Sequence, residues 1–148
     1  MCMGRSIETE ILIDARPADV WAVLSDLDRY EEWNPFIVAA RGQLSPGSKL
    51  KLTLRAGKTS VKIGPKVTVA DPDHELRWLG HLGIPGIFDG EHVHHLEPTE
   101  EGTTYKQSEE FGGMLIPLMG RLLKDTAAGF RAMNAALKER VEGSAVRS

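Results

Sequence analysis

A long amphipathic pattern near the end of the chain limits the folds that the chain can adopt. Apolar side chains, with one threonine among them, recur every three or four residues at Met119, Leu122, Leu123, Thr126, Phe130, Met133, Leu137 and Val141. This spacing predicts a helix of about six turns, roughly 35 Å long, with one buried face. We expect Gly143 to end this helix. Since no other long helical pattern occurs in the chain, this helix is expected to cover whatever sheet the preceding residues form.

The residues before this helix alternate between apolar and polar, which is the period of β-strands. The clearest case is KLKLTLR at residues 49–55, where leucines alternate with Lys, Thr and Arg. Similar segments at 7–15, 61–69, 74–82, 88–97 and 103–111 are separated by short turn sequences. After the first of them, RPADVWAVLSD and LDRYEEW predict two short helices. We therefore predict an α+β fold, with a curved antiparallel sheet of about six or seven strands around the long C-terminal helix.

Length, charge and cysteine content restrict the possible contexts. The 148 residues suit one domain, which we place at residues 6–142, with flexible termini at 1–5 and 143–148. A net charge of −3 does not favour nucleic acid as a partner. The sequence contains no long uncharged apolar run, so integral membrane association is not expected. Because the opening residues lack the apolar core of a secretory signal and Cys2 is the only cysteine, a reducing, cytoplasmic location is expected.

Two longer motifs resemble those of a known superfamily. PADVWAVLSDLDRYEEWNPF is similar to the opening signature of the superfamily that contains START domains, birch-pollen-allergen-like proteins and polyketide cyclases (SRPBCC). GEHVHHLEP and GTTYKQSEEFGG are similar to its closing strand pair. The resemblance spans about residues 6–142. It implies the helix-grip fold, in which a curved sheet surrounds the C-terminal helix and leaves an interior cavity.

The same resemblance implies a class of function. Cavities of this superfamily take sterols, lipids, hormones, flavonoids or polyketides. We therefore expect binding of a small hydrophobic molecule, lipid-, sterol- or polyketide-like, as a carrier or sensor. Two alternatives remain: an aromatase, cyclase or dehydratase acting on a polyketide-like substrate, and a protein-interaction module like the chaperone-associated members. Most members need no metal, so no cofactor is expected, and both a monomer and a homodimer are compatible with the sequence.

Three histidines lie close together in GEHVHHLEP and are predicted to face in different directions. Side chains alternate along a strand, so His92 and His94 share a face with Leu96, while His95 faces the other way, toward solvent. On the following strand one face carries Tyr105, Gln107, Glu109 and Phe111. If the hairpin pairs positions 96 and 105, His94 faces Gln107 and His92 faces Glu109. A register slip of two residues would keep all four side chains inside but change the partners.

This polar cluster in an apolar interior has several interpretations. It can be a satisfied hydrogen-bond network, since a buried carboxylate needs a partner. It can orient a ligand, since a few polar groups in an apolar pocket do this. It can be catalytic, with His92 and Glu109 as an acid–base pair. His92, His94 and a carboxylate could also hold a zinc or iron ion, but no further ligand follows at a convincing spacing, so no metal site is predicted.

The expected cavity walls combine this cluster with aromatic and aliphatic side chains. Aromatic residues fill cores more often than they contact ligands, but in this fold they would also enclose the cavity. The predicted ligand-cavity residues are Trp33, Phe36, Leu52, Leu54, Trp78, Phe88, His92, His94, Gln107, Glu109, Phe111, Phe130 and Met133.

Overall fold

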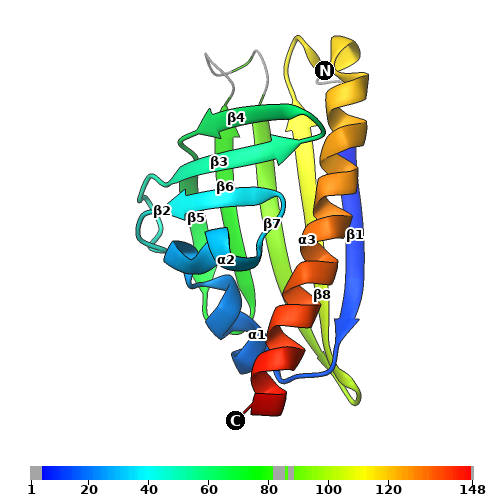
Figure 1. Ribbon diagram of the computed structural model, residues 1–148. Helices are drawn as coiled ribbons and strands as arrows, with labels where there is room; N and C mark the ends of the chain where they lie inside the picture. Colours follow the sequence, from blue (N-terminus) through cyan, green and yellow to red (C-terminus); the bar gives the residue numbers. More distant parts are fainter. Residues whose placement is uncertain (1–4, 82–85, 87–88, 148) are drawn as a thin grey trace.

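A computed structural model describes residues 5–81, 86 and 89–147 of the chain. Side chains are described as far as residue 143, and only the backbone for residues 144–147. The elements follow in the order β1 (Arg5–Ile13), α1 (Pro17–Leu24), a 3₁₀ turn (Leu27–Arg29), α2 (Tyr30–Trp33), β2 (Ile37–Arg41), β3 (Lys51–Ala56), β4 (Thr59–Ile63), β5 (Lys66–Asp71), β6 (Glu75–His81), β7 (Asp89–Thr99), β8 (Gly102–Gly112), a second 3₁₀ turn (Ile116–Leu118) and α3 (Gly120–Arg147) (Figure 1).

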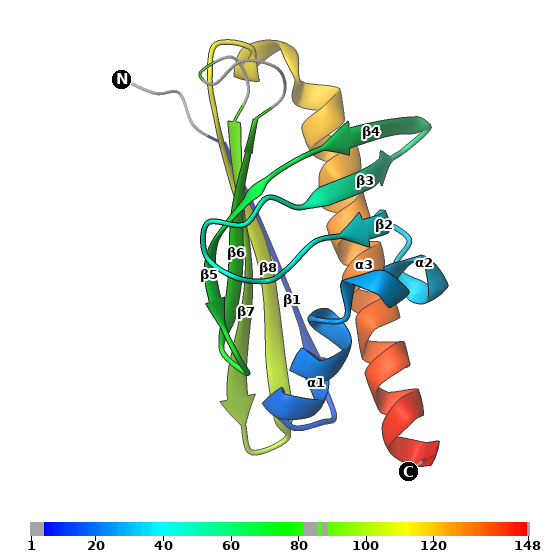
Figure 2. The same ribbon diagram turned by 90° about the vertical axis from the view of Figure 1, so that its left-hand side faces the viewer.

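The strands form two antiparallel sheets that enclose one side of α3. The larger sheet has the order β1-β8-β7-β6-β5, and the smaller has the order β2-β3-β4. A single antiparallel bridge between Lys49 and Lys66 connects them. In Figure 2 the larger sheet is seen edge-on, α3 runs alongside it, and β3 and β4 reach from the sheet toward the helix. The predicted α+β class, with a curved antiparallel sheet around a C-terminal helix, is therefore confirmed.

The predicted strand at residues 61–69 is in fact two strands in different sheets. Gly64 and Pro65 separate β4 from β5, and the chain crosses from the smaller to the larger sheet between them. Proline has no N–H for a ladder hydrogen bond, so it interrupts a strand inside a sheet. With this division, and with β2, which lies outside the predicted segments, the described residues contain eight strands rather than six or seven.

The helices follow the sequence pattern, except at the end of α3. Pro17 occupies the first turn of α1, and Val20 and Leu24 on its inner face are fully buried. The long helix does not end at Gly143 but continues to Arg147. A single glycine costs a helix about 1 kcal/mol, which does not by itself end it, and Gly143 does not adopt the positive φ of a helix terminus.

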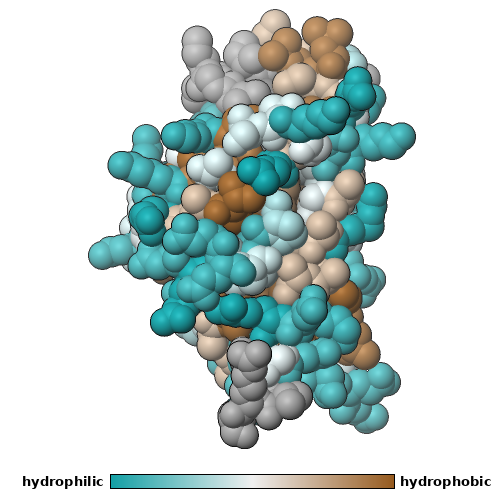
Figure 3. Space-filling view, in the orientation of Figure 1, coloured by the Kyte–Doolittle hydropathy of each residue, from teal (hydrophilic) through white to brown (hydrophobic). Residues whose placement is uncertain are grey.

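The core lies between α3, α1 and the concave face of the larger sheet. Its largest fully buried side chains include Trp78, Tyr30, Tyr105, Phe36 and Phe130. In the described part of the chain no helix is long and apolar enough to cross a membrane. Figure 3 shows a mostly hydrophilic face over β2, β3 and β4, with hydrophobic residues at the end where α3 begins, where Met114 and Leu118 are 77% and 79% exposed.

Candidate functional site

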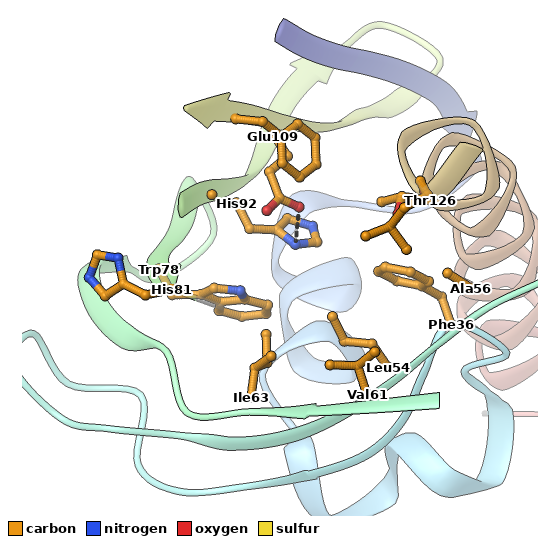
Figure 4. A pocket seen from close by; sticks show the side chains of 14 residues that line it. Phe36, Leu54, Ala56, Val61, Ile63, Trp78, His81, His92, Glu109 and Thr126 are labelled. Carbon is orange, nitrogen blue, oxygen red and sulfur yellow. Dashed lines mark hydrogen bonds and ion pairs between the residues drawn. The ribbon is translucent and has the colours of Figure 1, made fainter. Parts of the chain in front are cut away.

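A small cavity of about 90 Å³ lies between the β3–β4 hairpin, the larger sheet and the first turns of α3 (Figure 4). It is lined by Phe36, Leu54, Ala56, Val61, Ile63, Trp78, Gly80, His81, Gly90, His92, Glu109, Phe111, Leu122 and Thr126. Most of this wall is apolar, and Leu54, Val61 and Ile63 are only half-buried. Because typical ligand sites occupy about 300–1,000 Å³, this cavity is small for a ligand site.

Glu109 on β8 brings a carboxyl group to the cavity wall. Its side chain is 15% exposed, and its Oε1 lies 3.5 Å from Nδ1 of His92. Gly90 on β7 makes room for the carboxyl, since a Cβ atom at position 90 would lie 2.1 Å from Glu109 Oε2. Burial raises the pKa of Glu109 to about 8. The carboxyl is therefore protonated at neutral pH and can donate a hydrogen bond.

His92 beside it is neutral and held in one tautomer. Its ring is almost fully buried, and burial lowers its pKa to about 4, although the hydrogen bond to Gln107 acts in the opposite direction. Nε2 of His92 lies 2.8 Å from Oε1 of Gln107. An amide oxygen only accepts, so the hydrogen is on Nε2 and the lone pair is on Nδ1, on the side of Glu109.

A chain of hydrogen bonds fixes which way the Gln107 amide points. The hydroxyl of Thr9 donates to the backbone carbonyl of Gln107 at 2.9 Å, so it can only accept from Nδ2 of Asn134, also at 2.9 Å. The Asn134 oxygen then accepts from Nε2 of Gln107 at 2.8 Å. Gln107 therefore turns its oxygen toward His92. Because the chain starts at a backbone carbonyl, which cannot donate, every orientation in it is determined.

His94 lies next to His92 but belongs to a separate buried contact. Its ring stacks on His92 with centroids 4.4 Å apart and planes at 19°. Nδ1 of His94 is 2.6 Å from the hydroxyl of Tyr105, and its Nε2 has no hydrogen-bond partner in the described part of the chain. Burial, followed by the proximity of His92, lowers the pKa of His94 well below its usual value. Stacked rings do not direct their nitrogens at one point, and no group of three metal-ligating side chains occurs among the described residues.

A second histidine–carboxylate pair lies at the rim of the cavity. Nδ1 of His81 is 2.6 Å from Oδ1 of Asp89, and both carboxylate oxygens of Asp89 accept from the backbone N–H of Gly86. The hydrogen bond from His81 is the main cause that lowers the pKa of Asp89. In Figure 4 His81 lies apart from His92 and Glu109, so the two pairs do not form one cluster.

The strand register agrees with the alternation argument. His92 pairs with Glu109, His94 with Gln107 and position 96 with position 105. His95 lies on the outer face, where it is 43% exposed and its Nδ1 is 3.5 Å from Glu75. The hydrogen bonds do not follow the cross-strand pairs, however. They run diagonally, from His92 to Gln107 and from His94 to Tyr105.

The structure brings about half of the predicted cavity residues to the wall. Those that line it are Phe36, Leu54, Trp78, His92, Glu109 and Phe111. Leu52, His94, Gln107, Phe130 and Met133 are buried in the core instead, and Trp33 packs partly buried against it in an edge contact with Tyr30. The physical reason is that α3 packs directly on the sheet over most of its length, so only the end near its first turns stays open. Phe88 lies outside the described residues.

Sequence reasoning missed two kinds of residue. One kind is the wall that the β3–β4 hairpin and α3 supply, namely Ala56, Val61, Ile63, Leu122 and Thr126, together with Gly80, His81 and Gly90. The other is Asn134, which is fully enclosed and orients Gln107. A signal for Asn134 was present, since it is a polar residue four positions after Phe130, within the apolar stripe of the helix.

This fold and cavity define a helix-grip protein with an apolar interior site. The sequence profile of a family described as polyketide cyclase / dehydrase and lipid transport matches residues 4–142, and the chain belongs to that family. No curated protein matches the sequence.

Solved structures share the fold at low sequence identity. The Zhui aromatase/cyclase from Streptomyces sp. R1128 aligns with a TM-score of 0.77 and 13% identity, covering 94% of each chain. Norcoclaurine synthase from Thalictrum flavum, in complex with dopamine and hydroxybenzaldehyde, aligns with a TM-score of 0.72 and 17% identity, covering 96% of this chain and 88% of that chain. Protein MLL2253 from Mesorhizobium loti aligns with a TM-score of 0.74 and 19% identity, covering 93% of this chain and 97% of that chain.

Proposed function

We propose that the protein binds a small, neutral, largely apolar molecule in the cavity beside β3 and β4, as a carrier or sensor. The observation that carries this proposal is the uncharged pair of Glu109 and His92 in a mostly apolar wall. A few polar groups in an apolar pocket orient a ligand without the cost of burying a charge. Family membership supports this class of ligand, and the two aromatic molecules bound to norcoclaurine synthase support a small ring.

A ligand larger than one ring would need the cavity to widen. The tip of the β3–β4 hairpin lies against α3 at Asp125, where a Cβ atom on Gly57 would be 2.8 Å from a carboxylate oxygen. We propose that this contact opens for larger ligands. Loops and hairpins that cover binding sites commonly move in this way.

Native mass spectrometry of protein purified from its own host tests the proposal, with one matched pair of variants. In Gly90→Ala the new methyl group would collide with the Glu109 carboxyl, whereas in Gly112→Ala it would meet nothing within 4 Å. We expect a retained small molecule in the wild type and in Gly112→Ala, and its loss in Gly90→Ala. Equal retention in the two variants, or a wild type that retains nothing and binds no small apolar probe, would contradict the proposal.

Acid–base catalysis of the cyclase or dehydratase kind is a second candidate. It is favoured by a protonated carboxyl placed 3.5 Å from a neutral imidazole nitrogen. In a dehydration, Glu109 would give its proton to the leaving hydroxyl, which departs as water. His92 would take a proton from the neighbouring carbon, whose C–H electrons form the new double bond. A substrate turned over by the wild type, and at the same rate by the variant carrying both His92→Ala and Glu109→Gln, would exclude this candidate.

A further inference from the structure

The hydrogen-bonding polarity of the site restricts the chemical group that its ligand presents; this inference rests on the proposed function. Glu109 is mostly buried in a largely apolar wall, and the only ion-pair contact found for it among the described residues is with the neutral His92. Its carboxyl therefore offers an O–H donor. His92 offers an acceptor at Nδ1, because the chain from Thr9 through Asn134 and Gln107 holds the hydrogen on Nε2.

The donor and the acceptor do not satisfy each other well. Their separation of 3.5 Å is longer than the usual O–H···N or O–H···O hydrogen bond, and no other hydrogen bond to the Glu109 carboxyl is found in the described part of the chain. An oxygen atom at ordinary hydrogen-bond distance, about 2.8 Å, from both Oε1 and Nδ1 would lie to one side of the line that joins them. To satisfy both groups, that oxygen must accept one hydrogen and donate another.

We propose that the ligand's polar group is a neutral hydroxyl, of a phenol or an alcohol, that accepts from Glu109 and donates to Nδ1 of His92. An ether or ketone oxygen accepts only, so it would leave the His92 nitrogen unpartnered. An ammonium group donates only, so it would leave the Glu109 proton unpartnered. A carboxylate would bring an uncompensated charge into the apolar wall. The proposal also assigns Gln107 and Asn134 as positioning residues, since they act on the ligand through His92.

Three matched probes test the hydroxyl assignment: benzyl alcohol, benzyl methyl ether and ethylbenzene. Titration of the wild-type protein at neutral pH, followed by the NMR signal of the Trp78 indole in the cavity wall, gives a Kd for each. We expect benzyl alcohol to bind at least about tenfold more tightly than either analogue, because it makes both hydrogen bonds, whereas the ether makes only the one that it accepts from Glu109 and ethylbenzene makes neither. Comparable binding of all three would overturn the hydroxyl assignment and leave the proposed function standing. If none of the three bound, both would fail.

The pH dependence of probe binding shows whether the Glu109 carboxyl is the hydrogen-bond donor. The titratable side chains that line the cavity are His81, His92 and Glu109, and Glu109 has its pKa at about 8. Above that pH the carboxylate can only accept, so benzyl methyl ether loses the hydrogen bond that it accepts from Glu109 and should bind more weakly. Glu109→Gln keeps a donor that does not ionise, so its affinity for the ether should not change above pH 8. Glu110→Gln, its exposed neighbour on the opposite face of β8, should behave as the wild type.

The positioning role of Asn134 needs a readout that a structural role would not change. We expect the ¹⁵N signals of the His92 ring to show hydrogen on Nε2 in the wild type. In Asn134→Leu, which completes the apolar stripe, the Gln107 Nε2 keeps only its long hydrogen bond of 3.4 Å to the backbone carbonyl of Phe130. We therefore expect a mixture of tautomers and a weaker preference for the alcohol. A single unchanged tautomer in the folded variant would overturn the positioning role. If the variant did not fold, Thr9→Val provides the test: it removes the hydroxyl that accepts from Asn134, so it should also give a mixture of tautomers.

Discussion

In the wild type we expect the free energy of unfolding to fall as the pH rises toward 8. In Glu109→Gln we expect this fall to be absent. Burial raises the pKa of this carboxyl in the folded protein from 4.5 to about 8. Between these values the folded protein holds a proton that the unfolded chain releases, so the free energy of unfolding falls as the pH rises. Glutamine has nearly the same shape and does not ionise, so the variant lacks this dependence.

The size of the expected change in the free energy of unfolding depends on the pH range in which Glu109 acts without an opposing group. His92 and His94 act in the opposite direction: burial lowers the pKa of both, that of His92 from 6.5 to about 4, so their contribution grows with pH and is largely complete above about 6.5. From there to about pH 8 the Glu109 effect is uncompensated, at about 1.4 kcal/mol per pH unit. We therefore expect the wild type to lose about 2 kcal/mol relative to the variant over this interval, and the variant to lose almost nothing.

Urea unfolding followed by tryptophan fluorescence, at several pH values between about 6.5 and 8.5, measures this difference. Glu110→Gln is the matched control, because it makes the same chemical change at an exposed position on the same strand. It should lose stability in parallel with the wild type. Parallel curves for the wild type and Glu109→Gln would refute the reasoning, since the carboxyl would then be ionised in the folded protein at neutral pH.

Two further predictions concern packing and buried polar groups. In Gly129→Ala the added Cβ atom would lie 2.4 Å from the buried ring of Phe36, so overpacking should outweigh the helix propensity of alanine and destabilise the protein by about 1–2 kcal/mol. Gly143 lies in the same helix with open space around it, so Gly143→Ala should instead stabilise the protein by about 0.5–1 kcal/mol. Changes of the same sign in the free energy of unfolding of the two variants, measured in urea, would contradict this. Tyr105→Phe removes the hydroxyl at 2.6 Å from Nδ1 of His94. The variant should lose about 1–3 kcal/mol of stability, because a buried nitrogen is left unpartnered. An unchanged denaturation midpoint would show that the nitrogen finds another partner.

The fold and the inward faces of the hairpin could be predicted because both depend on periodicity. Alternation along β7 and β8 placed His92, Gln107 and Glu109 on the inner face, and the register confirmed their pairing. One interruption was also visible in the sequence, since Gly64 and Pro65 divide the segment that was predicted as a single strand.

What periodicity cannot supply is how far a helix fills the space against a sheet. Phe130 and Met133 were predicted at the cavity wall, but they are fully buried where α3 packs on the larger sheet. Hydrogen-bond partners are equally hidden, because they depend on side-chain rotamers. Cross-strand pairing placed His92 opposite Glu109, yet its hydrogen bond goes diagonally to Gln107, which Asn134 orients from the helix.

A crystal structure of the protein with benzyl alcohol tests the central claim most directly. We expect the ring in the cavity between β3, β4 and α3, with its oxygen at hydrogen-bond distance, about 2.8 Å, from both Glu109 and Nδ1 of His92. An alcohol bound only outside the cavity, or bound inside with its oxygen turned away from these two groups, would contradict the account.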